Sequence, residues 1–199
     1  SERAVDFLQK FKVKLFKISS FEINDFKLIK KIAKTKKPVI VSTGMASLKE
    51  IKECVKLIKK YHSKIIILHC VSGYPTDENQ ANLQRILTLK NYFKKFNIGL
   101  SDHTDNITTS IASISYNTIL IEKHFILSKK LKSLDRKFSI NPVELKELSR
   151  NSKIIFSALG DGKFKVQKNE KSSIKFRRSI FSIKKIKKGE KFNGKNIST

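Results

Sequence analysis

Residues 65–74 have the sequence IIILHCVSGY, and the order of residue types within them indicates the class of fold. Its first half is an unbroken aliphatic run rich in β-branched residues. Such runs are typical of a parallel strand that is buried on both faces of its sheet. The second half consists mainly of His, Cys, Ser, Gly and Tyr, which are residue types common in turns and in functional sites. The stretch therefore predicts a buried strand that ends in a polar cluster.

Four other runs repeat this pattern along the chain, and amphipathic stretches separate them. The predicted strands are residues 13–18, 38–42, 97–101 and 118–122. Residues 47–61 have helical spacing of apolar side chains, and Ser47 followed by Glu50 is the sequence of a capping box. Asn141 before Pro142 predicts a second helix start. Alternating strands and helices predict an α/β fold with a parallel sheet, either a barrel or an open sheet.

The polar clusters that follow the strands favour the barrel. They occupy residues 17–22, 42–45, 69–74, 101–104 and 122–125. Five clusters at five strand ends converge at the carboxyl face of a (β/α)8 barrel, whereas an open sheet brings only one or two together at its switch point. Five strand–helix units are fewer than a closed barrel needs. We therefore expect part of a TIM (β/α)8 barrel over residues 1–158.

Composition narrows the class of protein. The 199 residues carry a net charge of +26, yet all but six of the 43 basic side chains are dispersed lysines. Nucleic-acid readers favour arginine on one face, so we expect no nucleic-acid partner. No apolar run is long enough to span a membrane, and the start is not a secretory signal peptide. Two cysteines form no disulfide framework, so we expect a cytoplasmic protein.

The last forty residues differ from the rest. Residues 159–175 are polar, lysine-rich and contain Gly160 and Gly162, which predicts a linker. Residues 176–199 contain a strand-like run near Ile180 and a turn at Gly189, which predicts the beginning of a separate small β domain.

The motifs together resemble the sialic acid synthase family, which makes N-acetylneuraminic, legionaminic and pseudaminic acids. The matching motifs are KISSFE (17–22), PVIVSTGM (38–45), LHCVSGYPT (68–76), GLSDHT (99–104), IEKHF (121–125) and RRS (177–179). The resemblance implies a transferase that condenses phosphoenolpyruvate with an N-acetylated hexose, such as N-acetylmannosamine, and releases phosphate by C–O cleavage. It also implies barrel strands four to eight followed by the opening of a SAF (antifreeze-like, β-clip) domain. We therefore expect a fragment that is inactive alone, from a protein that forms a domain-swapped homodimer.

A divalent metal is expected at two histidines. His103 and His124 follow successive predicted strands, and their imidazoles can share one ion while leaving positions open for water and substrate. The resemblance implies Mn²⁺ there, with Mg²⁺ or Co²⁺ as other possible ions, acting as a Lewis acid on the sugar aldehyde. His69 is expected to be structural, and His62 to face solvent.

The resemblance also implies the residues of the substrate pocket. Lys17, Ser20, Ser42 and Ser101 match positions that contact phosphoenolpyruvate, and Lys123 is a further candidate cation. Glu22, Asp135 and Tyr74 match positions around the sugar, although residues 133–136 are Ser-Leu-Asp-Arg where the family usually has Gly-Pro-Asp-His. Catalytic roles are implied for Glu22, Glu122, His103 and His124, with Glu122 orienting the site or a water. Arg178 is expected to reach the sugar in the partner subunit's barrel.

Two other classes of function remain open from the residues. A Schiff-base aldolase or lyase on the same barrel can use Lys17 or Lys123 as its covalent amine. A basic nucleic-acid-binding protein can use the C-terminal segment, although the strand-end clusters then have no purpose.

Overall fold

The chain divides into two units. The computed structural model describes residues 1–199, with one unit at Ser1–Gly160 and the other at Asp161–Thr199. No helix is both long enough and apolar enough to cross a membrane.

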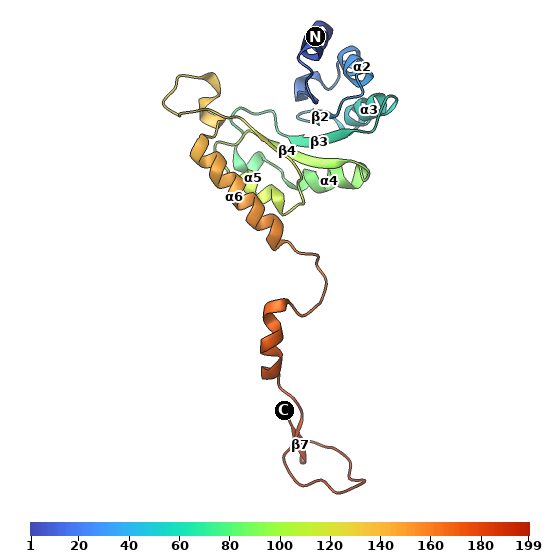
Figure 1. The fold of residues 1–199 in the computed structure, drawn as a ribbon, viewed down its shortest axis with the longest axis vertical. Helices are drawn as coiled ribbons and strands as arrows, with labels where there is room; N and C mark the ends of the chain where they lie inside the picture. Colours follow the sequence, from blue (N-terminus) through green and yellow to red (C-terminus); the bar gives the residue numbers. More distant parts are fainter. The chain divides into compact units, whose positions relative to one another are not determined.

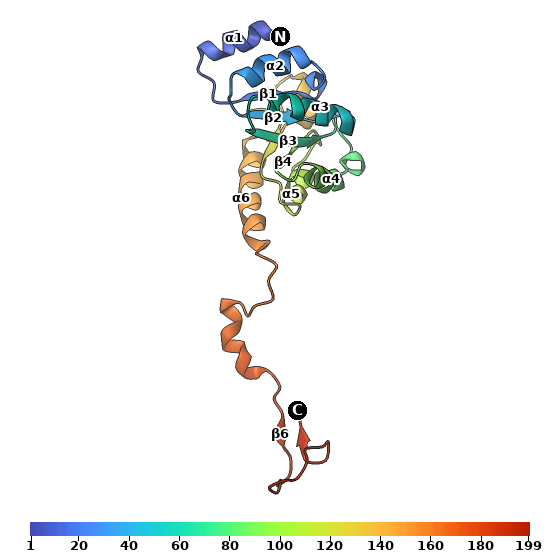
Figure 2. The ribbon, with the colours of Figure 1, turned by 90° about the vertical axis from the view of Figure 1, so that its right-hand side faces the viewer.

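Five parallel strands form the sheet of the first unit, in the same order as in the chain (Figures 1 and 2). They are β1 (Phe16–Ile18), β2 (Val39–Ser42), β3 (Ile65–Cys70), β4 (Asn97–Asp102) and β5 (Ile121–Lys123). The register pairs Ile18 with Val41, and Ser101 with Glu122. Because all five strands run in one direction, their carboxyl ends meet at one edge of the sheet. The predicted parallel α/β arrangement is confirmed.

Helices connect the strands in the βα pattern that the sequence predicts. They are α1 (Glu2–Lys10), α2 (Phe26–Lys34), α3 (Leu48–Lys59), α4 (Gln84–Tyr92), α5 (Thr108–Ile114) and α6 (Pro142–Ala158). Short 3-10 helices lie at Ser20–Glu22 (η1), Glu78–Gln80 (η2) and Leu134–Phe138 (η3). Both predicted helix starts are present: Ser47 and Glu50 form a capping box on α3, and Asn141 caps α6 with its side chain.

The core lies between the sheet and these helices. Ile18, Val41 and Ile67 from the strands are fully buried against Ile29 and Ile58 from α2 and α3. Burying each such side chain contributes about 1.5–3 kcal/mol to folding, so this layer holds the strand ends in place.

The first and last strands are shorter than predicted. The first begins at Phe16 rather than at residue 13. The last covers Ile121–Lys123 rather than 118–122, because the turn after α5 extends further: Asn117 has φ +54°, and the Thr118 hydroxyl donates to the Ser113 carbonyl at 2.7 Å. The Leu120 carbonyl then lies so close to Gly99 that a Cβ atom there would meet it at 2.5 Å.

The second unit has little regular structure. It contains a 3-10 helix, η4 (Lys168–Phe176), and a two-stranded antiparallel ladder of β6 (Phe181–Ser182) and β7 (Ile197–Ser198). This helix overlaps the C-terminal part of the segment predicted as a linker, residues 159–175, and that domain boundary stays a prediction. Its start is fixed by the backbone N–H of Gln167, which donates to the Glu170 carboxylate at 2.6 Å.

Candidate active site

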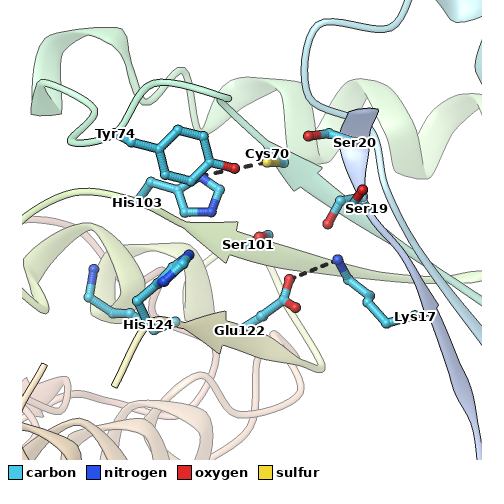
Figure 3. Close-up of a pocket in the computed structure, with 11 residues that line it drawn as sticks. Lys17, Ser19, Ser20, Cys70, Tyr74, Ser101, His103, Glu122 and His124 are labelled. Atoms are coloured by element: carbon cyan, nitrogen blue, oxygen red, sulfur yellow. Dashed lines mark hydrogen bonds and ion pairs between the residues drawn. The ribbon is translucent and has the colours of Figure 1, made fainter. Parts of the chain in front are cut away.

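One pocket gathers residues from the carboxyl ends of all five strands (Figure 3). It has a volume of about 290 Å³. Its lining consists of Lys17, Ser19, Ser20, Ser42, Cys70, Tyr74, Ser101, His103, Glu122, Lys123 and His124. We call this cavity the strand-end pocket. Eight of the residues expected at the site from the sequence lie in it: Lys17, Ser20, Ser42, Tyr74, Ser101, His103, Glu122 and His124.

An ion pair crosses the pocket from the first strand to the last. The ammonium of Lys17 on β1 lies 3.1 Å from Oε2 of Glu122 on β5 (Figure 3). That oxygen is screened from solvent, yet it accepts no aligned hydrogen bond. Both side chains remain partly exposed, so an incoming ligand can exchange for this contact. Lys17 is therefore a cation available to an anionic ligand.

Serine hydroxyls line the same pocket as this cation. Ser42, at the end of β2, is only 2% exposed, and its Oγ has no hydrogen-bond partner. A buried hydroxyl without a partner costs free energy, and a bound ligand that accepts its hydrogen bond removes that cost. Ser20, in contrast, has a hydrogen-bond partner, because its Oγ lies 2.8 Å from Oγ of Ser72.

Gly44 allows the segments that follow β1, β2 and β3 to approach one another closely. A Cβ atom at this position would lie 2.3 Å from Cβ of Ser20 and 2.4 Å from Oγ of Ser72. Its φ of +46° also falls in the region that glycine adopts without strain. The turn after β2 therefore requires glycine.

The two predicted metal-binding histidines face each other across the other half of the pocket (Figure 3). Their ring centroids are 5.4 Å apart, and the Tyr74 ring lies 4.2 Å from that of His103. Nδ1 of His103 donates to the Val71 carbonyl at 2.7 Å, which leaves Nε2 as the lone-pair nitrogen. Burial lowers the pKa of His103, which favours the neutral imidazole.

The chemistry of these two histidines suits a divalent metal ion. Metal ligation needs neutral imidazoles whose second nitrogen is held by another group. His103 has the Val71 carbonyl, and Nδ1 of His124 lies 3.3 Å from a carboxylate oxygen of Asp135. No group of three or more His, Cys, Asp or Glu side chains is arranged to hold an ion. Two protein ligands would leave the remaining positions to water or substrate.

Lys123 is engaged elsewhere. Its Nζ lies 3.1 Å from Oδ2 of Asp102 and donates to the Thr104 carbonyl at 2.7 Å. The lysine and aspartate side chains are 3% and 1% exposed. Burial lowers the pKa of Lys123, and Asp102 opposes that effect. Lys123 borders the pocket, but its ammonium is buried and held by two protein oxygens, whereas that of Lys17 is partly exposed and contacts Glu122 alone.

Cys70 and Ser19 are pocket residues that the sequence argument did not select. Cys70 is 1% exposed, its Sγ lies 3.8 Å from Nδ1 of His103, and burial raises the pKa of its thiol. Both belong to the predicted strand-end clusters, Ser19 to residues 17–22 and Cys70 to residues 69–74, and this position was the available signal.

Three predicted site residues lie outside the lining. Glu22 accepts hydrogen bonds from the backbone N–H and hydroxyl of Ser19, at 3.1 and 3.0 Å. Asp135, on η3, is next to His124 but does not line the cavity. Arg178 belongs to the second unit, and its role in the site stays a prediction.

The remaining histidines differ in environment. His69 is fully buried, and its Nε2 lies 2.7 Å from the Ala81 carbonyl, which confirms the structural role. The prediction that His62 faces solvent is wrong. It is half-buried: its Nε2 is screened from solvent without a hydrogen-bond partner, and its Nδ1 accepts from the Lys64 N–H at 3.2 Å.

Comparison with known proteins gives consistent matches. Residues 1–164 match the sequence profile of the NeuB family. The chain is 42% identical over 200 residues to the N,N'-diacetyllegionaminic acid synthase of Campylobacter jejuni, covering 98% of this chain and 60% of that protein. It is 38% identical over 198 residues to a pseudaminic acid synthase of Campylobacter jejuni, covering 98% of this chain and 57% of that protein.

A solved structure matches the fold. The N-acetylneuraminic acid (sialic acid) synthetase of Leptospira borgpetersenii, determined in complex with citrate, superposes with a TM-score of 0.82. The two are 36% identical, and the match covers 87% of this chain and 60% of that one. The five strands thus correspond to part of a TIM barrel, and the chain spans about 60% of the length of the proteins it matches.

Proposed function

Because this chain belongs to the NeuB family, we propose that the strand-end pocket serves the condensation of phosphoenolpyruvate with an N-acetylated hexose. The products are a nonulosonic acid and phosphate. The names of the similar proteins include legionaminic and pseudaminic acid synthases, which supports this class of product.

The observation that carries the proposal is the unpartnered hydroxyl of Ser42 in the pocket that also holds Lys17. Phosphoenolpyruvate has a phosphate and a carboxylate, both of which need a cation and hydroxyl donors. Ser20 and Ser101 line the same pocket and add two more hydroxyls. We assign this half of the pocket to phosphoenolpyruvate, with Glu122 released from Lys17 when the anion binds.

The opposite half suits the sugar aldehyde. His103 and His124 would hold a divalent metal ion there, Mn²⁺ in our proposal, and the bound ion would polarise the aldehyde oxygen. Tyr74 covers this half, since its ring packs against His103 and lies 6.0 Å from that of His124. Asp135 contacts His124, and Glu22 contacts Ser19, so we place both carboxylates at the pocket mouth, where they would meet sugar hydroxyls.

The reaction then needs a water at a defined place. C3 of phosphoenolpyruvate forms a bond to the aldehyde carbon, whose oxygen takes up a proton. The cationic C2 then takes up water, which gives up one proton, and the C–O bond to phosphate breaks as the new C2 hydroxyl passes its proton to the leaving phosphate and becomes the ketone. Glu122 lines the pocket and is released when Lys17 turns to the anion, so in our proposal it orients that water and takes its proton. The chain contributes binding, orientation and this proton acceptor.

We further propose that residues 176–199 begin a SAF domain and that Arg178 completes the pocket of a second subunit in a domain-swapped homodimer. A planar guanidinium can hydrogen-bond the N-acetyl carbonyl or a hydroxyl of the sugar. The RRS motif at 177–179 supports this proposal.

Phosphate release by the complete protein tests the function. Unaltered protein with Mn²⁺, phosphoenolpyruvate and N-acetylmannosamine or a related N-acetylated hexose should release phosphate. Lys17→Ala should raise the KM for phosphoenolpyruvate roughly 10- to 100-fold and leave the KM for the sugar nearly unchanged, because a charged hydrogen bond contributes about 1.5–3 kcal/mol.

Lys14→Ala is the matched control, since Lys14 is an exposed lysine on the same segment. Phosphate release that needs no acceptor sugar, or equal effects of Lys17→Ala on both substrates, would contradict the assignment.

A further inference from the structure

A buried ion pair links the two strand ends that carry the pocket histidines. Asp102 is the last residue of β4, Lys123 is the last residue of β5, and the sheet register pairs them directly. Each precedes a histidine, His103 or His124. The proposed reaction gives this pair no chemical task, although it is among the most deeply buried charge pairs that the chain contains.

The ion pair restrains the chain on both sides of His103. Lys123 Nζ contacts the Asp102 carboxylate, which precedes His103, and the carbonyl of Thr104, which follows it. The Asp102 carboxylate also accepts from the Thr104 backbone N–H at 2.9 Å and from the Ser110 hydroxyl. The backbone around one histidine is therefore bound to the residue next to the other.

The neighbouring structure supplies only part of this restraint. The His124 carbonyl accepts from the Ile140 N–H at 2.8 Å, and the Tyr74 ring lies 4.2 Å from that of His103 and 6.0 Å from that of His124. β5 has only three residues and pairs with β4 alone in the sheet, so few ladder hydrogen bonds hold it. The Val71 carbonyl and Asp135 fix how each imidazole is turned, but neither joins one histidine to the other. The ion pair is the direct side-chain link between the two strand ends.

Stability alone does not account for burying these charges. Two apolar side chains of similar size generally stabilise a core as well as a buried ion pair does, or better. A hydrogen-bonded ion pair fixes the distance and the orientation between its two groups. Apolar packing does not fix them in this way.

We propose that Asp102 and Lys123 are positioning residues that set the spacing of His103 and His124. This inference rests on the proposed metal-binding role of the histidines, but the spacing itself can be measured without metal. The rings have their centroids 5.4 Å apart, close enough for nuclear Overhauser effects between ring protons.

The main variant is Asp102→Asn with Lys123→Met, which removes both charges and leaves none unpaired. We expect it to keep the folded amide spectrum of the chain. In metal-free protein the ring-to-ring Overhauser effects should be lost, and Mn²⁺ alone, followed by its electron paramagnetic resonance signal, should bind 10- to 100-fold more weakly.

The control is Asp6→Asn with Lys31→Met, which removes another Asp–Lys pair, 2.7 Å long, between α1 and α2. Both measurements should match those of the unaltered chain. A folded Asp102→Asn, Lys123→Met chain that keeps the Overhauser effects and the Mn²⁺ affinity overturns the inference.

Two further outcomes are also decisive. If the double variant does not fold, Lys123→Arg keeps the charge but changes its length. Shifted ring contacts in a folded Lys123→Arg chain support positioning, and unchanged ones overturn it. If the unaltered chain binds no Mn²⁺, the metal part of the proposed function fails, and the Overhauser effects alone decide the inference.

Discussion

The two units of this chain differ in how they use apolar residues. Residues 1–160 bury theirs in one cluster that includes Ile18, Ile58 and Ile67. In residues 161–199, Phe164, Phe176 and Phe192 are each at least 70% exposed, and the only strands have two residues each. An isolated two-stranded ladder is marginally stable at best. Local hydrogen bonds and turns thus form secondary structure in both units, but only the first has a core to fix a site.

The largest expected effect tests whether the second unit, despite lacking a core, serves a pocket. In the complete protein, His103→Ala and Arg178→Ala should each remove most phosphate release. Mixing the two variants with subunit exchange should restore about a quarter of the activity of unaltered protein, because half of the dimers are mixed and each has one complete site.

The measurement is phosphate release before and after exchange, with the mixed dimer proven by differently tagged subunits. A mixture that exchanges subunits yet stays inactive would show that Arg178 does not complete a pocket between chains.

A smaller but still large effect should separate the two units by stability. Ile67→Ala, in the centre of the sheet, should lower the free energy of unfolding by about 2–5 kcal/mol through lost burial and a cavity. Phe181→Ala, 65% exposed on β6, should change it by less than about 0.5 kcal/mol. Urea unfolding followed by circular dichroism gives both values. A comparable loss from both variants would mean that the second unit shares the core of the first.

The sequence predicted the features that follow from the order of strands and helices along the chain. Parallel βα units force strand ends to one edge, so the clusters beginning at Lys17, Ser42 and Ser101 were expected to meet, and they do. Contacts made by side chains across that edge were not predictable in the same way. Lys17 and Lys123 both border the pocket, but only their surroundings show that one faces Glu122 and the other is held by Asp102.

Boundaries and turns were less predictable for a physical reason. The start of β5 depends on how the turn at Asn117 and Thr118 closes against the end of α5, and a propensity pattern carries no information on that contact. The helix at 168–176 depends on local backbone capping in a stretch whose composition is typical of a linker.

The smallest expected effect is a pH dependence confined to the first unit. Burial lowers the pKa of His69 from its ordinary value of 6.5, with the charge of Arg85 contributing and the Ala81 carbonyl opposing. The unfolded chain therefore binds the proton more readily. The stabilising contribution is complete above pH 6.5 and is lost as the pH falls through the lower folded-state pKa.

Urea midpoints should accordingly fall between pH 7.5 and pH 5.5, and His69→Asn should reduce that slope. Residues 161–199 contain no histidine, so their amide signals should stay constant over the same interval. A slope that His69→Asn leaves unaltered would assign the acid sensitivity to other groups.

Gly44 has a consequence for how this protein can evolve. Every other amino acid carries a side chain, and at this position even a methyl group would collide with Ser20 and Ser72. The collision would displace hydroxyls from two other strand ends at once. No gradual route of substitutions is therefore open at codon 44, and drift in this pocket has to proceed through the residues around a glycine that stays fixed.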